Sequence, residues 1–152
     1  MELDFKAATL ADVDALTPLM REYYEYDGIP FDEAKARKAL AGFLSHDSFG
    51  RAWLVCQADA IAGYIVLTYD YGLESGGREA FIDEFYLRAA YRGQGIGRKT
   101  IEFAEQFCAA NGIRTLLLGV EPENTAAQAF YRKVGFEDRR LRIWTKPIVK
   151  ER

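Results

Sequence analysis

Hydrophobic and polar positions follow several different periods along this chain of 152 residues. Leu3 and Phe5 alternate with polar neighbours, which predicts a half-buried strand. From residue 11 to about residue 26, apolar side chains recur every three or four positions, as on one face of a helix. A second helix is predicted over about residues 32–44. The chain therefore opens with a strand and two amphipathic helices.

The middle of the chain is predicted to form a sheet. Three consecutive strands are expected over residues 52–57, 62–71 and 80–87, with a tight turn joining the first two. A glycine-rich turn then leads into an amphipathic helix that ends near Asn111. The apolar run at residues 116–120 does not alternate, which is typical of a strand covered on both faces. A strand, a helix and a strand in this order predict a parallel βαβ unit.

The last part of the chain predicts one short helix and one strand. Residues 124–133 form the helix, which Gly135 ends, and residues 141–148 alternate again as expected of a final antiparallel strand. We therefore expect an α/β fold in which a mixed, mostly antiparallel central sheet contains one parallel βαβ unit. Helices should cover both faces of this sheet. The length predicts a single domain over residues 1–152.

The glycine turn is the part of the sequence most informative about chemistry. Residues 92–97 read R-G-Q-G-I-G and open a helix, so several backbone N–H groups have no helical acceptor. These donors and the positive end of the helix dipole favour an anion, and glycine lets a phosphate approach the main chain. Arg92 and Arg98 flank the turn. The spacing differs from the Rossmann and P-loop patterns, but it still predicts a di- or polyphosphate ligand.

Two motifs together resemble a known family. The pattern R-x-x-G-x-G, at residues 92–97, directly follows a predicted strand that ends at Leu87. A second element, N-T-A-A-Q-A-F-Y-R-K-V-G-F at residues 124–136, follows a later strand. In this order and spacing the motifs resemble the GNAT superfamily of N-acetyltransferases, over roughly residues 50–145. The resemblance implies transfer of an acetyl group from acetyl-CoA, as co-substrate, to an amine.

The resemblance also implies how the cofactor is held. In the family, the strand before the glycine turn splays away from the next parallel strand, and its free main chain pairs with the pantetheine arm. The amides of the turn hold the pyrophosphate. The cofactor-binding residues implied for this chain are Phe85, Tyr86, Leu87, Arg92, Gly93, Gln94, Gly95, Ile96, Gly97, Arg98 and Asn124.

Asn124 and Tyr131 are the two candidates on the second motif. They are seven residues apart, so they share one face of a helix. In the family, a tyrosine at the position of Tyr131 often protonates the leaving thiolate, and the residue at Asn124 often holds the cofactor arm. A phenol pKa of about 10 against about 8.5 for a thiol permits this proton transfer. Alternatively, Asn124 is only a helix cap and Tyr131 only a packed aromatic.

Asp83 and Glu84 are the candidates for the catalytic base. Adjacent residues of a regular strand point to opposite faces, so only one carboxylate is expected to face the acetyl group. Some polyamine-type members of the family carry an acid at the position of Asp83, whereas others use an acid elsewhere or only water. Either residue could also be an ordinary solvated charge, and the sequence leaves the base open.

Tyr24 and Asp27 are the predicted substrate contacts. They lie three residues apart on one helix face, and an aromatic ring beside a carboxylate suits a cationic amine. Tyr23 belongs to the core stripe instead. The preferred acceptor is a small-molecule amine, although the same residues also suit a plain surface or a homodimer interface. Two further alternatives are acetylation of a protein N-terminus or lysine, and a non-catalytic acyl-CoA-binding sensor on the same fold.

Composition narrows the class of protein. The net charge of −3 argues against nucleic acid as a partner, because neutralising phosphates requires a basic face. With one histidine and two separated cysteines, a metal site is not expected. There is no leader-like segment and no apolar run long enough to span a membrane. These features predict a cytoplasmic protein with reduced thiols and without a membrane partner.

Overall fold

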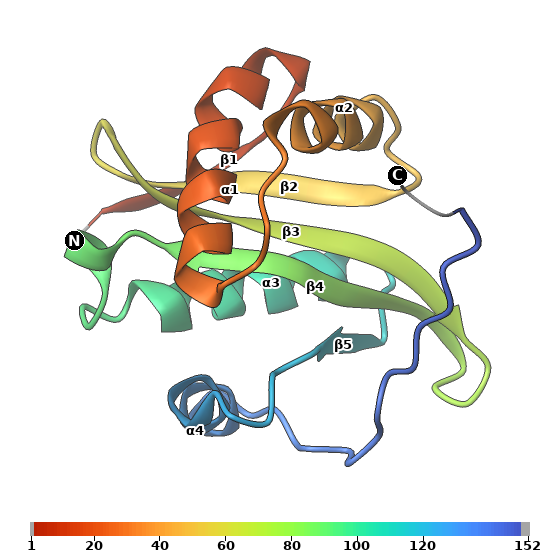
Figure 1. Cartoon of the computed structure of the whole chain (residues 1–152). Coiled ribbons are helices and arrows are strands. Elements are labelled where there is room, and N and C mark those ends of the chain that lie inside the picture. The colour runs from red at the N-terminus through yellow and green to blue at the C-terminus, as the bar shows by residue number, and fades with distance from the viewer. Residues whose placement is uncertain (1, 150–152) are drawn as a thin grey trace. The chain divides into compact units, whose positions relative to one another are not determined.

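The computed structural model describes residues 2–149 of the chain. They fall into two compact units, which divide after Gly119. The first unit contains the sheet and its covering helices, and the second contains one helix followed by extended chain (Figure 1).

The first unit is built on a five-stranded sheet with the order β1-β2-β3-β4-β5 (Figure 1). The strands are β1 (Leu3–Ala7), β2 (Gly50–Gln57), β3 (Ala60–Gly72), β4 (Gly77–Leu87) and β5 (Thr115–Leu118). Neighbouring strands from β1 to β4 pair antiparallel, whereas β5 pairs parallel to β4. The prediction of a mixed, mostly antiparallel sheet with a parallel βαβ unit is confirmed.

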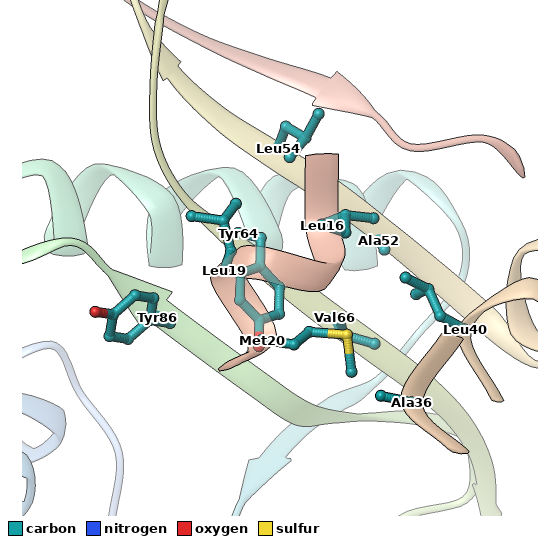
Figure 2. Close-up of a cluster of buried hydrophobic side chains, with 10 residues drawn as sticks. All are labelled: Leu16, Leu19, Met20, Ala36, Leu40, Ala52, Leu54, Tyr64, Val66 and Tyr86. Carbon is teal, nitrogen blue, oxygen red and sulfur yellow. The ribbon is translucent and has the colours of Figure 1, made fainter. Parts of the chain in front are cut away.

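Two helices cover one face of this sheet. They are α1 (Val13–Asp27), which follows a short 3-10 turn, η1 (Leu10–Asp12), and α2 (Glu33–Leu44). Thr9 and Asp12 form a capping box at η1, the turn that leads into α1. Asp32 caps α2 by accepting a hydrogen bond from the Lys35 amide at 3.1 Å. Figure 2 shows the core between these helices and the sheet. Its buried side chains are Leu16, Leu19, Met20, Ala36, Leu40, Ala52, Leu54, Tyr64, Val66 and Tyr86.

The other face of the sheet is covered by α3 (Ile96–Ala110), which follows a second 3-10 turn, η2 (Ala89–Tyr91). Ile96 is fully buried with Val55 of β2, and the Phe103 ring stacks on Phe5 of β1 with centroids 4.4 Å apart. Trp53 of β2 contacts Phe103 edge-on at 5.3 Å. The prediction of helices on both faces is therefore confirmed.

A β-bulge interrupts β4 at Asp83. Leu67 pairs with Ile82, but Val66, the preceding residue of β3, pairs with Glu84. Asp83 is therefore an extra residue in β4, opposite no residue of β3. Because a strand alternates its faces with a period of two, the extra residue changes the phase of β4 at this point.

Close contact between β3 and β4 depends on Gly63. A Cβ atom built at this position would lie 2.0 Å from the carbonyl oxygen of Tyr86. Only glycine therefore allows the two strands to approach as they do here. This contact fixes the carboxyl end of β4, immediately before η2 and the glycine turn.

Strand β5 is shorter and less covered than predicted. It spans Thr115–Leu118 rather than residues 116–120, and all four residues are half-buried. Within the sheet it lies at an edge, with only β4 as a neighbour, which accounts for its partial exposure.

The second unit contains α4 (Thr125–Lys133), which Asn124 caps by accepting a hydrogen bond from the Ala127 amide at 3.1 Å. The predicted final strand at residues 141–148 is wrong, because residues 137–147 form no helix or strand in the structure and residues 148–149 form only a bend. Leu141, Ile143 and Trp144 are 73%, 75% and 90% exposed. Alternation makes a stable strand only when a neighbouring strand supplies hydrogen bonds, and none pairs with this segment in residues 2–149.

Candidate active site

The glycine turn opens α3 in a conformation that leaves its amides available. Gly93 and Gly95 have φ angles of 75° and 82°, in the left-handed region that favours glycine. The Lys99 amide donates to the Gly95 carbonyl, so the amides of residues 96–98 precede the first helical hydrogen bond. A Cβ atom built at Gly93 or Gly95 would meet nothing within 4 Å. The turn therefore offers several donors, the positive helix end and open space to an anion.

The two long side chains of the turn make local contacts. Arg92 Nε donates to the Leu87 carbonyl at 2.9 Å, and its guanidinium lies 4.4 Å from the centroid of the Tyr26 ring. Gln94 Nε2 donates to the carbonyl of Ala90 at 2.9 Å. Arg98 is exposed on the first turn of α3. The predicted turn residues thus form one continuous surface segment, apart from the buried Ile96.

The strand before the turn has a free edge. Strands β4 and β5 pair only from Glu79 with Thr115 to Ile82 with Leu118. From residue 83 to residue 87 the edge of β4 has no strand beside it on that side in the described chain. Phe85, Tyr86 and Leu87, predicted from the family resemblance, lie in this segment. Main-chain donors and acceptors there can pair with an extended ligand.

Glu84 is held between two tyrosines from different elements. Its Oε1 accepts a hydrogen bond from the Tyr64 hydroxyl of β3 at 2.6 Å, and its Oε2 accepts one from Tyr24 of α1 at 2.5 Å. Burial raises the pKa of Glu84, while both hydroxyl donors act to lower it and Asp83 raises it further. Burial and the carboxylate also raise the pKa of Tyr24 and Tyr64, so both phenols stay protonated donors.

Asp83 belongs to the same electrostatic cluster. Its pKa is raised by partial loss of hydration, and its carboxylate raises the pKa of both Glu84 and Tyr24. The expectation that the two acids point to opposite faces assumes regular alternation, which the bulge breaks. Phe81 and Glu84 pair with Thr68 and Val66, which share a face of β3. Asp83 is two residues after Phe81, so the alternation of β4 before the bulge assigns it to the same face as Phe81 and Glu84.

The structure separates the two predicted substrate contacts. Tyr24 is half-buried and uses its hydroxyl on Glu84. The side chain of Asp27 is exposed at the end of α1 and makes no hydrogen bond or ion pair with residues 2–149. Tyr64 was not predicted for the site. The available signal was a tyrosine inside an apolar strand, whose buried hydroxyl needs a polar partner.

The second-unit candidates share α4. Asn124 caps the helix, as expected if its role is that of a helix cap. The Tyr131 ring contacts Phe130 and Phe136 edge-on, with centroids 5.2 and 5.6 Å apart. These contacts orient the ring within its own unit, and the roles of both residues in catalysis stay predictions.

None of the helices in residues 2–149 is long and apolar enough to cross a membrane. No group of three or more His, Cys, Asp or Glu side chains in the described chain is arranged to hold a metal ion.

Comparison with known proteins identifies the family. The sequence matches the acetyltransferase (GNAT) family over residues 13–136, which is most of the chain. The chain belongs to the GNAT acetyltransferase family. The predictions of family, fold class and acetyltransferase activity are thereby confirmed. The matched range includes the acid pair, the glycine turn and α4 of this GNAT protein.

Relatives and solved structures agree with this assignment. Thialysine N-epsilon-acetyltransferase of Bos taurus is 27% identical over 146 residues, covering 88% of this chain and 83% of its own. An integron cassette protein from a Cole Harbour salt marsh metagenome is 29% identical, with a TM-score of 0.84 over 97% of this chain and 91% of its own. AAC(6')-Iy in complex with a bisubstrate analogue shares the fold at 17% identity, with a TM-score of 0.81 over 98% of this chain and 100% of its own.

Proposed function

We propose that this GNAT protein is an acetyl-CoA-dependent N-acetyltransferase that acts on a small cationic amine. One observation carries the proposal. The free edge of β4 at residues 83–87 runs directly from the acid pair toward the glycine turn of α3. A short stretch of chain therefore contains three features in order: carboxylates suited to an amine, a free strand edge, and a helix start suited to an anion.

The cofactor is assigned to the turn and the strand edge. Acetyl-CoA supplies the activated acetyl thioester, and a solved structure of the same fold contains it. In this chain, the amides of residues 93–98 would bind the pyrophosphate, with Arg92 and Arg98 adding charge. The main chain of Phe85, Tyr86 and Leu87 would pair with the pantetheine arm. Asn124, in the second unit, is retained as a cofactor-binding candidate on the family resemblance alone.

The acceptor is assigned from charge. Asp83 and Glu84 give the site two neighbouring carboxylates with raised pKa values. A bound ammonium group would stabilise their ionised forms. Glu22 adds a further carboxylate near the end of β4, but Arg88 pairs with it at 3.0 Å. The name of the bovine relative, which refers to an amino acid with a side-chain amine, is consistent with such an acceptor.

The chemistry requires proton transfer in two directions. An amine attacks only after losing a proton. Unlike Glu84, Asp83 has no hydroxyl partner among residues 2–149, so it is the proposed base. Tyr131 is the proposed acid that protonates the leaving thiolate. Tyr24 and Asp27 remain the proposed substrate contacts on α1.

A thiol-release assay tests the proposal. The purified protein is incubated with acetyl-CoA and pools of small amines, including diamines and basic amino acids, and free CoA is measured against time. We expect release that depends on both the amine and the enzyme, and mass spectrometry should find an acetylated amine. Binding of acetyl-CoA without release in any pool would favour the non-catalytic sensor, and release with peptides alone would favour the protein acetyltransferase.

A further inference from the structure

Tyr64 is a buried tyrosine whose hydroxyl has a specific use. Its side chain is 0% exposed, in the middle of an apolar strand and beside Met20 and Leu19 of α1 (Figure 2). A phenylalanine would fill the same volume without a polar atom to satisfy. The hydroxyl is accounted for by Glu84, which lies diagonally across the β3–β4 pair and accepts its hydrogen bond at 2.6 Å.

Glu84 is consequently fixed from two sides. Tyr64 on β3 binds one carboxylate oxygen and Tyr24 on α1 binds the other. The two donors come from different elements, so they define both the place and the orientation of the carboxylate. Each carboxylate oxygen keeps a second lone-pair direction, which can accept a hydrogen bond from an ammonium group.

We propose that Tyr64 and Tyr24 are positioning residues that hold Glu84 as a fixed anion for the ammonium group of the acceptor amine. This proposal rests on the proposed function. Glu84 orients the bound ammonium. Asp83, which no hydroxyl of the described chain contacts, takes its proton: an N–H bond breaks and an O–H bond forms on Asp83. The neutral amine then has its lone pair available for the acetyl group.

The groups around Glu84 determine the pH at which it loses its charge, and therefore the pH dependence of amine binding. Tyr24 faces it from α1, Tyr64 faces it from β3, and Asp83 precedes it on β4. The tyrosines lower the pKa of Glu84 by donating, and Asp83 raises it. Removing one donor therefore raises this pKa further, and the ionised form, which binds the cation, is lost at a higher pH.

The first experiment compares Tyr64→Phe with a control on the same strand. Tyr71→Phe removes a hydroxyl from a tyrosine that is 65% exposed. We expect Tyr64→Phe to raise KM for the amine about tenfold and to move the acid limb of kcat/KM up by about one pH unit. KM for acetyl-CoA should stay within about twofold. Tyr71→Phe should match the parent in all three quantities.

A double-mutant cycle tests whether Tyr64 acts through Glu84. If it does, Tyr64→Phe in a Glu84→Gln background should cause little further loss, because the carboxylate is already absent. Independent losses that add, or an unmoved acid limb in folded Tyr64→Phe, would overturn the proposal. Should Tyr64→Phe fail to fold, Tyr24→Phe, which alters a half-buried hydroxyl, provides the same comparison.

The outcome also separates this proposal from the proposed function. A parent protein that releases no CoA with any amine contradicts the function itself. An active parent with an unaffected Tyr64→Phe variant contradicts only the positioning role. NMR titration of the Glu84 side-chain carboxyl gives a readout without turnover, and a pKa that is the same in parent and Tyr64→Phe would also refute the role.

Discussion

At the scale of single residues, the chemistry of this site depends on the carboxyl groups of Asp83 and Glu84. Both carboxyl groups have raised pKa values, chiefly because the protein removes part of their hydration. A carboxylate whose pKa is higher in the folded than in the unfolded state destabilises the fold when ionised. This cost is absent below the unfolded-state pKa, grows as pH rises from that value to the folded-state pKa, and is fully present above it.

Asp83→Asn should therefore lower activity and raise stability. We expect kcat to fall by about 10²-fold or more, as for loss of a general base. At pH 8 the midpoint of thermal unfolding should rise by about one to a few degrees. This gain should disappear below about pH 3, where Asp83 is protonated in both the folded and the unfolded state. Asp59→Asn, at an exposed turn, is the matched control. A variant with normal kcat would remove Asp83 from the mechanism.

Tyr131→Phe tests the proposed acid. The substitution keeps the ring, and with it the contacts to Phe130 and Phe136. We expect kcat to fall roughly 10²-fold while the affinity for acetyl-CoA changes little. Steady-state and single-turnover kinetics measure both. If the single-turnover rate stays within about twofold of the parent, Tyr131 is only a packed aromatic.

At this scale the sequence supplied the candidates but not their arrangement. Asp83 and Glu84 could be named from their place before the glycine turn. The bulge could not, because it depends on the register with β3, which local alternation does not reveal. Tyr64 was missed for a related reason, since its partner lies 20 positions away and only the paired strands bring them together.

At the scale of the element, the proposed cofactor site depends on the glycine turn and the start of α3. Gly97 lies in the first turn of the helix, beside the free amides, and its φ angle is not in the left-handed region. An aspartate there suits the helix dipole of the free protein but repels a bound phosphate. The same substitution can therefore separate an effect on folding from one on binding.

Gly97→Asp should weaken acetyl-CoA binding by at least about tenfold without lowering the unfolding midpoint. Gly97→Asn, nearly the same in size and without the charge, should bind more tightly than the aspartate variant. Calorimetry with acetyl-CoA and a thermal melt give the two quantities. Equal affinity in the aspartate variant and the parent would place the pyrophosphate elsewhere.

The approach of β3 to β4 gives a prediction about stability. Gly63→Ala brings a Cβ to 2.0 Å from the Tyr86 carbonyl, so the strands must separate. We expect a loss of about 1–3 kcal/mol in the free energy of unfolding and weaker acetyl-CoA binding, because the edge of β4 moves. Gly42→Ala, where a Cβ meets nothing within 4 Å on α2, is the control. The free energy of unfolding is measured with denaturant. The same value in Gly63→Ala and in the parent would contradict this account.

Strong periodic patterns predicted most elements. The helix spacing located α1, α2 and α3 within a few residues, and Asn111 marked the end of α3. The alternation at residues 141–148 led to a wrong strand, because a strand requires a partner as well as a pattern. The same limit explains β5, whose apolar run suggested full coverage although it lies at the edge of the sheet.

At the scale of the whole molecule, charge distinguishes the proposed acceptor from its rivals. The chain carries a net charge of −3, and in the first unit Asp83 and Glu84 concentrate negative charge where β4 loses its partner. Such a field favours cations on approach and on binding. It also predicts that activity toward a cationic amine falls as salt is added, because screening weakens the attraction.

The most direct test of the central claim compares acceptors that differ only in the charge at the far end. The series is 1,4-diaminobutane, 4-aminobutan-1-ol and 4-aminobutyrate, each with acetyl-CoA at saturation, and kcat/KM is measured for each. We expect the diamine to exceed the alcohol, and the alcohol to exceed the carboxylate, by about tenfold at each step. Equal values across the series, or a preference for the carboxylate, would contradict the claim that the negative charge around the site selects for positive charge on the acceptor.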